Sequence, residues 1–253
     1  MNQVEPQTEI FLTKFYERQF DPMHGINMAS PRLYDTFFTM VQDKRDVILP
    51  LVGVNTGENL NEPSNPVRGY VSGEIPRSSQ NKTEMAGSAY FNGEKMIGMM
   101  TQTEADIYFV LKGVYAFGYL TVPDPMEPNR VLVLNMEQAK KPKISVNTQD
   151  NSVCITLSLD GAVYYGESSF DYANHVELLE SYVGRIYKTR CMDFLTARQK
   201  EGLDILGIEK HIDTKFLTEK EREAYSFDLQ NMQFDIKTKV EIKRTGKLSG
   251  LRK

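Results

Sequence analysis

The strongest hydrophobic pattern in the chain runs from Tyr172 to Gln199 and has the period of a helix. Its apolar residues recur at about 100° per residue, so they share one stripe, and they are Val176, Leu179, Val183, Ile186, Tyr187, Phe194 and Ala197. Polar residues occupy the opposite side, namely Arg185, Lys188, Thr189, Thr196 and Gln199. Asn174 with Glu177 forms a capping-box-like start and Gly202 is a typical stop, so the pattern predicts one long helix.

Two segments that flank this helix alternate between apolar and polar residues, as strands with one buried face do. The first runs from Val153 to Leu159 and the second from Phe234 to Ile242. A helix with one apolar stripe and strands with one apolar face bury each other's apolar side chains. We therefore expect an α+β fold in which the long helix packs on a mainly antiparallel sheet.

Turn and capping signals predict the other elements. Asn92-Gly93 separates two strand-like runs, which predicts a hairpin with a type I′ turn and positive φ at both residues. Thr101 with Glu104 and Thr218 with Glu221 are capping boxes of two short helices, the first of which ends at Gly113. Helices are expected at 9–20, from Ser30-Pro31 onward and, in broken form, at 203–214. Further strands are expected at 47–54, 68–75, 116–122, 130–139, 143–148 and 152–166.

The polar loop Pro76–Lys82 is the best domain boundary in the sequence. We expect residues 1–83 to be the end of a preceding, smaller mixed α/β domain and residues 84–253 to form a complete C-terminal domain. The chain begins almost directly inside a helix-like pattern, so we also expect it to be an excised fragment.

Composition and charge restrict the classes of function. The 253 residues are 40% hydrophobic and 25% charged, which is typical of a globular protein, and the net charge of −4 argues against nucleic-acid binding by the whole surface. No run of about 18 apolar residues predicts a transmembrane helix. The C-terminal end is basic, with one acid, Glu241, among Lys237, Lys239, Lys243, Arg244, Lys247, Arg252 and Lys253. It is either the solvated face of an edge strand with a tail or a contact for an anionic membrane or an acidic partner.

Candidate chemistry is sparse. None of His24, His175 and His211 has a partner at metal-ligand spacing, and no phosphate-binding loop or nucleophile elbow is present. Cys154 and Cys191 are either two buried free thiols or a disulfide between sheet and helix, and the sequence leaves both open. We expect neither catalysis nor a cofactor or metal site.

Two stretches resemble the Ger(x)C family, the C subunits of bacterial spore germinant receptors. Ala89–Gly98, followed by Glu104 and Leu111-Lys112-Gly113, is similar to the family's hairpin: a small residue and Phe, a turn, Lys, an apolar pair, Gly, and a Glu that opens a helix. The second stretch, Gln199 and Asp204-Ile205-Leu206-Gly207 followed by the strand ending Ile242-Lys243-Arg244-Thr245-Gly246, resembles the family's closing segment. The resemblance covers about residues 84–248, and residues 1–83 resemble the end of the family's preceding domain.

The resemblance implies several mixed α/β domains without an enzyme active site. Members of the family are lipoproteins on the outer face of the spore inner membrane, where they assemble with membrane-spanning A and B subunits and signal nutrients to start germination. The sequence shows no signal peptide and no lipobox cysteine, so the expected lipid anchor belongs to a longer, full-length protein. The alternative is a soluble extracytoplasmic module that itself binds a small-molecule nutrient.

Apolar residues off the stripe of the long helix are the candidate partner contacts, namely Leu178, Met192 and Leu195. Off-stripe apolar residues of a helix either form an interface or pack against neighbouring segments of the same chain. The sequence leaves both alternatives open for all three.

Overall fold

The computed structural model describes residues 47–55, 69–76, 83–93, 95–167, 170–216 and 218–245, together with Thr36. The helices predicted at 9–20 and from Ser30 onward lie outside this part of the chain, apart from Thr36. The boundary predicted at 76–82 also lies outside it except for Pro76, so the division into domains at residue 83 stays a prediction.

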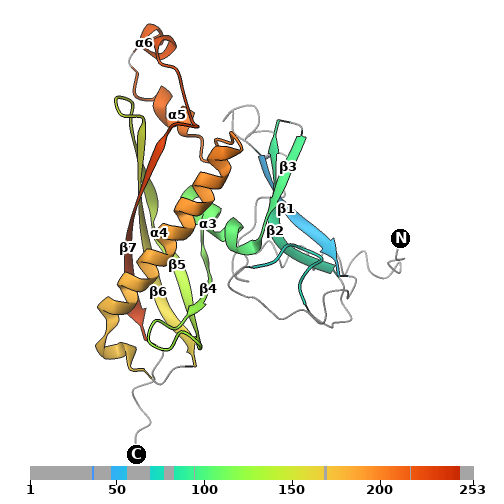
Figure 1. Ribbon diagram of the computed structural model, residues 1–253, viewed down its shortest axis with the longest axis vertical. Helices are drawn as coiled ribbons and strands as arrows, with labels where there is room; N and C mark the ends of the chain where they lie inside the picture. The colour runs from blue at the N-terminus through green and yellow to red at the C-terminus, as the bar shows by residue number, and fades with distance from the viewer. Residues whose placement is uncertain are drawn as a thin grey trace, which may run out of the picture.

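The larger sheet has four strands in the order β4-β5-β6-β7 (Figure 1). Their bounds are Phe117–Pro123, Val131–Asn147, Ser152–Gly166 and Gln233–Arg244. The first two pairs are antiparallel, whereas β6 and β7 run parallel, with α4 (Val176–Lys200), α5 (Ile208–Asp213) and α6 (Glu219–Ala224) between them in sequence. The sheet is thus mainly antiparallel and α4 crosses one of its faces, as the α+β prediction states.

Helix α4 buries the predicted stripe against the sheet. Leu179, Val183, Tyr187 and Phe194 are buried, together with Cys191. The helix comes close to β7 at Gly184, whose carbonyl accepts a hydrogen bond from Thr238 Oγ1 at 3.1 Å. A side chain at position 184 would lie 3.1 Å from the same hydroxyl, so glycine permits this approach.

Of the two predictions for the ends of α4, the glycine stop is confirmed and the capping box is wrong. Gly202 has φ +73°, and the amides of Leu203 and Gly202 donate to the carbonyls of Arg198 and Gln199, which is the expected glycine stop. The predicted capping box of Asn174 is wrong. Tyr172–Asn174 form a 3₁₀ turn capped by Asp171, and α4 follows His175 without a side-chain cap.

The smaller sheet has three antiparallel strands in the order β1-β2-β3, with bounds Val47–Val54, Thr83–Asn92 and Lys95–Met100. Helix α3 (Gln102–Lys112) follows β3, begins with the predicted capping box of Thr101 and Glu104, and ends at Gly113, where φ is +78°. In Figure 1, α3 lies between the two sheets. Residues of β2, α3, α4 and the larger sheet share one hydrophobic core.

Three other local predictions need correction: those for the hairpin turn, for β5 and for the segment 69–76. The hairpin closes with the pair Asn92↔Lys95, so Asn92 belongs to the strand, and Gly93, with φ +57°, begins the turn. A type I′ turn centred on Asn92-Gly93 is therefore wrong, because such a turn would leave Asn92 outside the ladder, whereas Asn92 pairs with Lys95. The strands predicted at 130–139 and 143–148 are one strand, β5, with irregular pairing around residue 140.

The segment 69–76 is not the predicted strand. It is held by side chains instead: the buried Glu84 accepts hydrogen bonds from the amides of Gly73 (2.7 Å) and Ile75 (3.3 Å) through Oε2. Its other oxygen accepts from Asn55 Nδ2 at 2.6 Å. Glu84 thereby fastens this segment to β2 without a continuous strand ladder.

Candidate interaction surface

The three predicted contact residues have different environments in α4. Leu178 is 38% exposed, Met192 is partly buried against the core, and Leu195 is only 3% exposed. Of these three side chains, Leu178 alone is presented to solvent to an extent that a partner could use directly. Leu195 packs within the chain, which is the second of the two alternatives that the sequence left open. A role of the three in partner binding stays a prediction.

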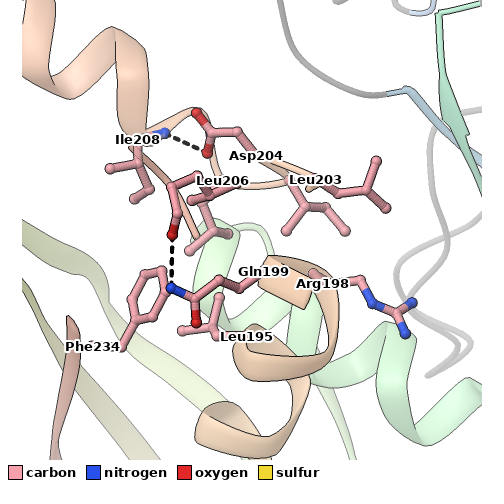
Figure 2. A pocket seen from close by; sticks show the side chains of 10 residues that line it. Leu195, Arg198, Gln199, Leu203, Asp204, Leu206, Ile208 and Phe234 are labelled. Carbon is pink, nitrogen blue, oxygen red and sulfur yellow. Dashed lines mark hydrogen bonds between the residues drawn. The ribbon is translucent and has the colours of Figure 1, made fainter. Parts of the chain in front are cut away.

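Leu195 lies at a depression beside the C-terminal end of α4 (Figure 2). The depression encloses about 220 Å³, counting space open to solvent, and is lined by that end of α4, the segment 203–208, Leu229 and Phe234. Figure 2 shows the Arg198 side chain extending away from Asp204 rather than towards it. A ligand pocket is concave and has converging polar groups, whereas this depression is open to solvent and its Arg198 side chain points away from Asp204, so it gives little support to a nutrient pocket.

Side chains of the closing segment Gln199–Gly207 hold the connection between α4 and α5 in place. Gln199 Nε2 donates to the carbonyls of Leu229 and Met232, both at 2.7 Å, although its place on the polar side predicted exposure. Asp204 accepts from the amides of Ile208 (2.7 Å, drawn in Figure 2) and Glu209 (2.8 Å), and Gly207 starts α5 with φ +72°. Burial raises the pKa of Asp204, while these amides act in the opposite direction. The segment therefore positions α5.

A polar cluster of Tyr90, Arg198 and Glu201 connects the two sheets. Tyr90 Oη donates to Glu201 Oε1 at 3.2 Å, and the guanidinium carbon of Arg198 lies 4.4 Å from the centre of the Tyr90 ring. Arg198 Nε lies 3.1 Å from Glu201 Oε2, which pairs the charges without the geometry of a hydrogen bond. Burial raises the pKa of Tyr90, and Glu201 adds to the rise while Arg198 opposes it. The cluster fixes the hairpin to the end of α4.

Gly98 of the hairpin makes room for this cluster. It lies opposite Tyr90 across the β2–β3 ladder, and a Cβ at position 98 would be 2.4 Å from Tyr90 Oη. The glycine of the hairpin segment is therefore a packing requirement for the junction with α4.

The His and Cys side chains of the described residues are dispersed over the fold. In the described ranges, no group of three or more His, Cys, Asp or Glu side chains is placed to bind a metal. His175 is exposed at the start of α4 and His211 is exposed in α5, while His24 lies outside the description. Cys191 is buried in α4, Cys154 is half-buried on the opposite face of the sheet, and both are free thiols. Burial raises the pKa of Cys191 to about 12.

Sequence reasoning missed an apolar stretch that the structure exposes. Met96, Ile97 and Met99 of β3 are 41–53% exposed, and β3 is an outer strand of the smaller sheet. Consecutive apolar residues usually predict burial on both faces of a strand, so the pattern indicated the opposite. None of the described helices is long and apolar enough to cross a membrane.

Comparisons with known proteins agree on the fold and the family. Residues 86–246 match the model of the family described as spore germination B3/GerAC-like, C-terminal. The crystal structure of the GerBC protein matches with a TM-score of 0.57 at 12% identity, covering 86% of this chain and 64% of GerBC. The chain thus spans less than two thirds of the length of GerBC, and the likeness shows a shared fold. No curated protein matches significantly.

Proposed function

The chain belongs to the spore germination B3/GerAC-like C-terminal family, and from this premise we propose that it is part of the non-catalytic C subunit of a spore germinant receptor. The family match carries the proposal, since it covers the hairpin, α4 and the closing strand β7 as one unit. The expected Ger(x)C membership and the α+β fold are both confirmed.

The proposed role is that of a rigid signalling module. In the full-length protein, an N-terminal lipid anchor would hold the module on the outer face of the spore inner membrane. There it would assemble with the membrane-spanning A and B subunits and help couple nutrient binding to a change in the complex. The shared core of the two sheets and the Tyr90–Arg198–Glu201 junction support this role, because a module with one core transmits a displacement as a unit.

We place one contact with these subunits at Leu178. Its neighbour one turn later, Tyr182, donates its hydroxyl to the carbonyl of Pro123 at 2.8 Å and thereby holds the loop after β4. Met126 in that loop is 44% exposed. Leu178 lies on α4 itself, and Met126 lies in a loop that a side chain of α4 holds in place. Both are therefore exposed apolar side chains in fixed positions, and fixed positions lower the entropy that an interface anchor loses on binding.

The experiment is affinity capture of the tagged full-length protein from detergent-solubilised spore membranes. We expect two multi-spanning membrane proteins with the wild type and about tenfold less of both with Leu178→Glu, because a carboxylate would be buried in an apolar contact. Val114→Glu is the matched control, since Val114 is an exposed apolar residue outside α4.

Two results would contradict these proposals separately. Absence of both membrane proteins from the wild-type capture would contradict the receptor-subunit role. Normal recovery with folded Leu178→Glu protein would leave that role intact and remove Leu178 from the interface.

A further inference from the structure

The larger sheet has one face without a covering helix among the described elements. Side chains of β6 alternate: Val153, Ile155 and Leu157 are buried in the core with α4, whereas Cys154 and Thr156 point to the other side and are partly exposed. Helices α3 and α4 both contribute to the core on the buried side (Figure 1). We call the opposite side, which carries Cys154, Thr156 and Ser158, the outer face.

Four lysines form two adjacent rows across the outer face. Lys143 pairs with Thr156, which is next to Lys237, and Lys140 pairs with Ser158, which is next to Lys239. All four lysines are exposed. Strand spacing places the two lysines of a row about 10 Å apart at Cα, and along β6 and β7 the rows are about 7 Å apart. On β5, Lys140 and Lys143 are three residues apart, and an irregularity in the pairing between them brings both into these rows. Two hydroxyl groups, of Thr156 and Ser158, lie between the four charges.

These lysine rows keep most of their positive charge uncompensated. Among the described residues Lys140, Lys143 and Lys239 form no ion pair, and Lys237 approaches only Asp235 of its own strand, at 3.8 Å. Four like charges this close repel one another, which is unfavourable for an isolated sheet. The arrangement is favourable when an anionic partner lies over it.

The adjacent row has the opposite charge. It consists of Glu137, Asp160 and Glu241, and Lys243 pairs with the last two of these carboxylates. This pairing lowers the pKa of Glu241 and raises that of Lys243. Lys243 therefore supplies the main compensation of the acidic row and Lys239 a smaller part, so most of the charge of the lysine rows remains available.

We propose that the lysine rows bind an extended acidic segment of a partner protein, with Asp or Glu at alternate positions. Alternate residues of an extended chain lie about 7 Å apart on one side, which matches the separation of the rows. Lysine is a point charge on a flexible stem and suits such side-by-side pairing without a concave site. The acidic row repels a segment that slides along the strands, so it sets the register.

The same charges disfavour an anionic membrane as the partner. From the row of Glu137, Asp160 and Glu241 to the row of Ser145, Cys154 and Asp235, the outer face carries four lysines and four carboxylates, and Lys243 lies just beyond the first of these rows. A flat anionic surface would meet all of these groups together and gain little, because the face as a whole is nearly neutral. A narrow acidic segment meets the lysine rows alone. The inference does not depend on the proposed receptor role.

The test uses the purified chain and two labelled peptides. The first, the alternating peptide, is a threonine peptide in which one threonine separates two aspartates, so that each aspartate meets one lysine row, and the second has the same composition with the two aspartates adjacent. We expect fluorescence anisotropy to show tighter binding of the alternating peptide, and weaker binding as salt shortens the screening length.

Charge reversal locates the binding surface. Lys143→Glu with Lys239→Glu is expected to weaken binding of the alternating peptide about tenfold, because attractions are lost and repulsions gained. The control is Arg185→Glu with Lys188→Glu, which makes the same charge change on the exposed side of α4. Melting temperatures check folding, and Lys143→Gln with Lys239→Gln is the milder pair should the first not fold.

Three results would overturn the proposal. The first is that the alternating peptide does not bind at millimolar concentration. The second is that the two double charge reversals weaken peptide binding equally. The third is that the protein binds preferentially to vesicles with 30% phosphatidylserine and that the Lys143 and Lys239 variants abolish this binding. The last result would assign the lysine rows to a lipid surface.

Discussion

The Tyr90 side chain occupies the space that a side chain at position 98 would need. A Cβ there would lie 2.4 Å from the hydroxyl oxygen and 2.7 Å from the ring carbon that bears it. Gly98→Ala must therefore displace the ring and weaken both its hydrogen bond to Glu201 and its contact with Arg198. We expect a loss of about 1–3 kcal/mol in the free energy of unfolding, measured by urea denaturation.

Gly166→Ala is the control for that substitution. The nearest atom to a new Cβ at position 166 is Leu132 Cδ1 at 3.2 Å, the end of a flexible side chain. Equal stability losses for the two alanine variants would show that Tyr90 adapts without strain.

The two cysteines are expected to react at very different rates. Burial raises the pKa of Cys191 to about 12, so its thiol is neutral and inaccessible near neutral pH, whereas Cys154 is half-buried on the outer face. A thiol reagent such as Ellman's reagent should label one cysteine quickly in the native protein and the second only in denaturant. Cys154→Ser should remove the fast phase, and rapid labelling of two thiols would contradict the burial of Cys191.

At the scale of elements, α5 depends on the carboxylate that caps it. Burial raises the pKa of Asp204, so the folded chain binds a proton there more readily than the unfolded chain. The contribution of Asp204 to stability therefore increases as pH falls through its folded pKa. Between about pH 7 and about pH 4.5, we expect wild type to gain stability relative to Asp204→Asn in urea denaturation.

Asp228 provides a comparison of opposite sign. Hydrogen bonds from the Asn231 side chain and amide lower its pKa, so its contribution is lost on acidification. Asp228→Asn should be less stable than wild type at neutral pH, and this difference in stability should narrow only as pH falls below about 4, where the unfolded chain begins to protonate Asp228. The same pH trend for both variants would show a general effect of charge rather than the two local environments.

Capping and alternation could be predicted because they are local. Thr101 with Glu104, Thr218 with Glu221 and Gly202 each act within a few residues, and each forms as the sequence indicates. Strand pairing is not local. The parallel direction of β6 and β7 and the single long β5 depend on contacts between segments that are distant in the chain, which one sequence does not specify.

For the candidate surfaces, too, local features could be predicted from the sequence and contacts between distant segments could not. The alternating lysines of β7 were visible in the sequence and left two interpretations open, but only the register places Lys140 and Lys143 two strands away from Lys237 and Lys239. Leu195 was a candidate contact residue because it lies off the apolar stripe, which the sequence shows. The sequence does not show that the segment 203–208 packs beside Leu195. Gly98 was recognised within the hairpin segment, but the reason for it required the position of Tyr90.

At the scale of the whole molecule, the two sheets are joined through Arg198. Its side chain is buried, pairs with Glu201 and lies over the ring of Tyr90. Arg198→Ala removes this connection while leaving both sheet ladders intact. We expect faster hydrogen–deuterium exchange in 83–100 and little change in 152–166, since local stability follows local contacts.

Lys200→Ala is the control for this measurement, because Lys200 is exposed in the last turn of the same helix. Uniformly faster exchange in both sheets of Arg198→Ala would mean that they unfold as one cooperative unit.

The parallel pairing of β6 with β7 also has a consequence for how the chain is made. Ser152 lies beside Gln233 and Leu159 beside Val240, with three helices between the two strands in sequence. During synthesis, β6 emerges with β5 on one edge and no neighbour on the other until the last strand has followed. Closing so long a loop comes late in folding, so newly made chains pass through a stage in which β6 is open to pairing with a wrong strand.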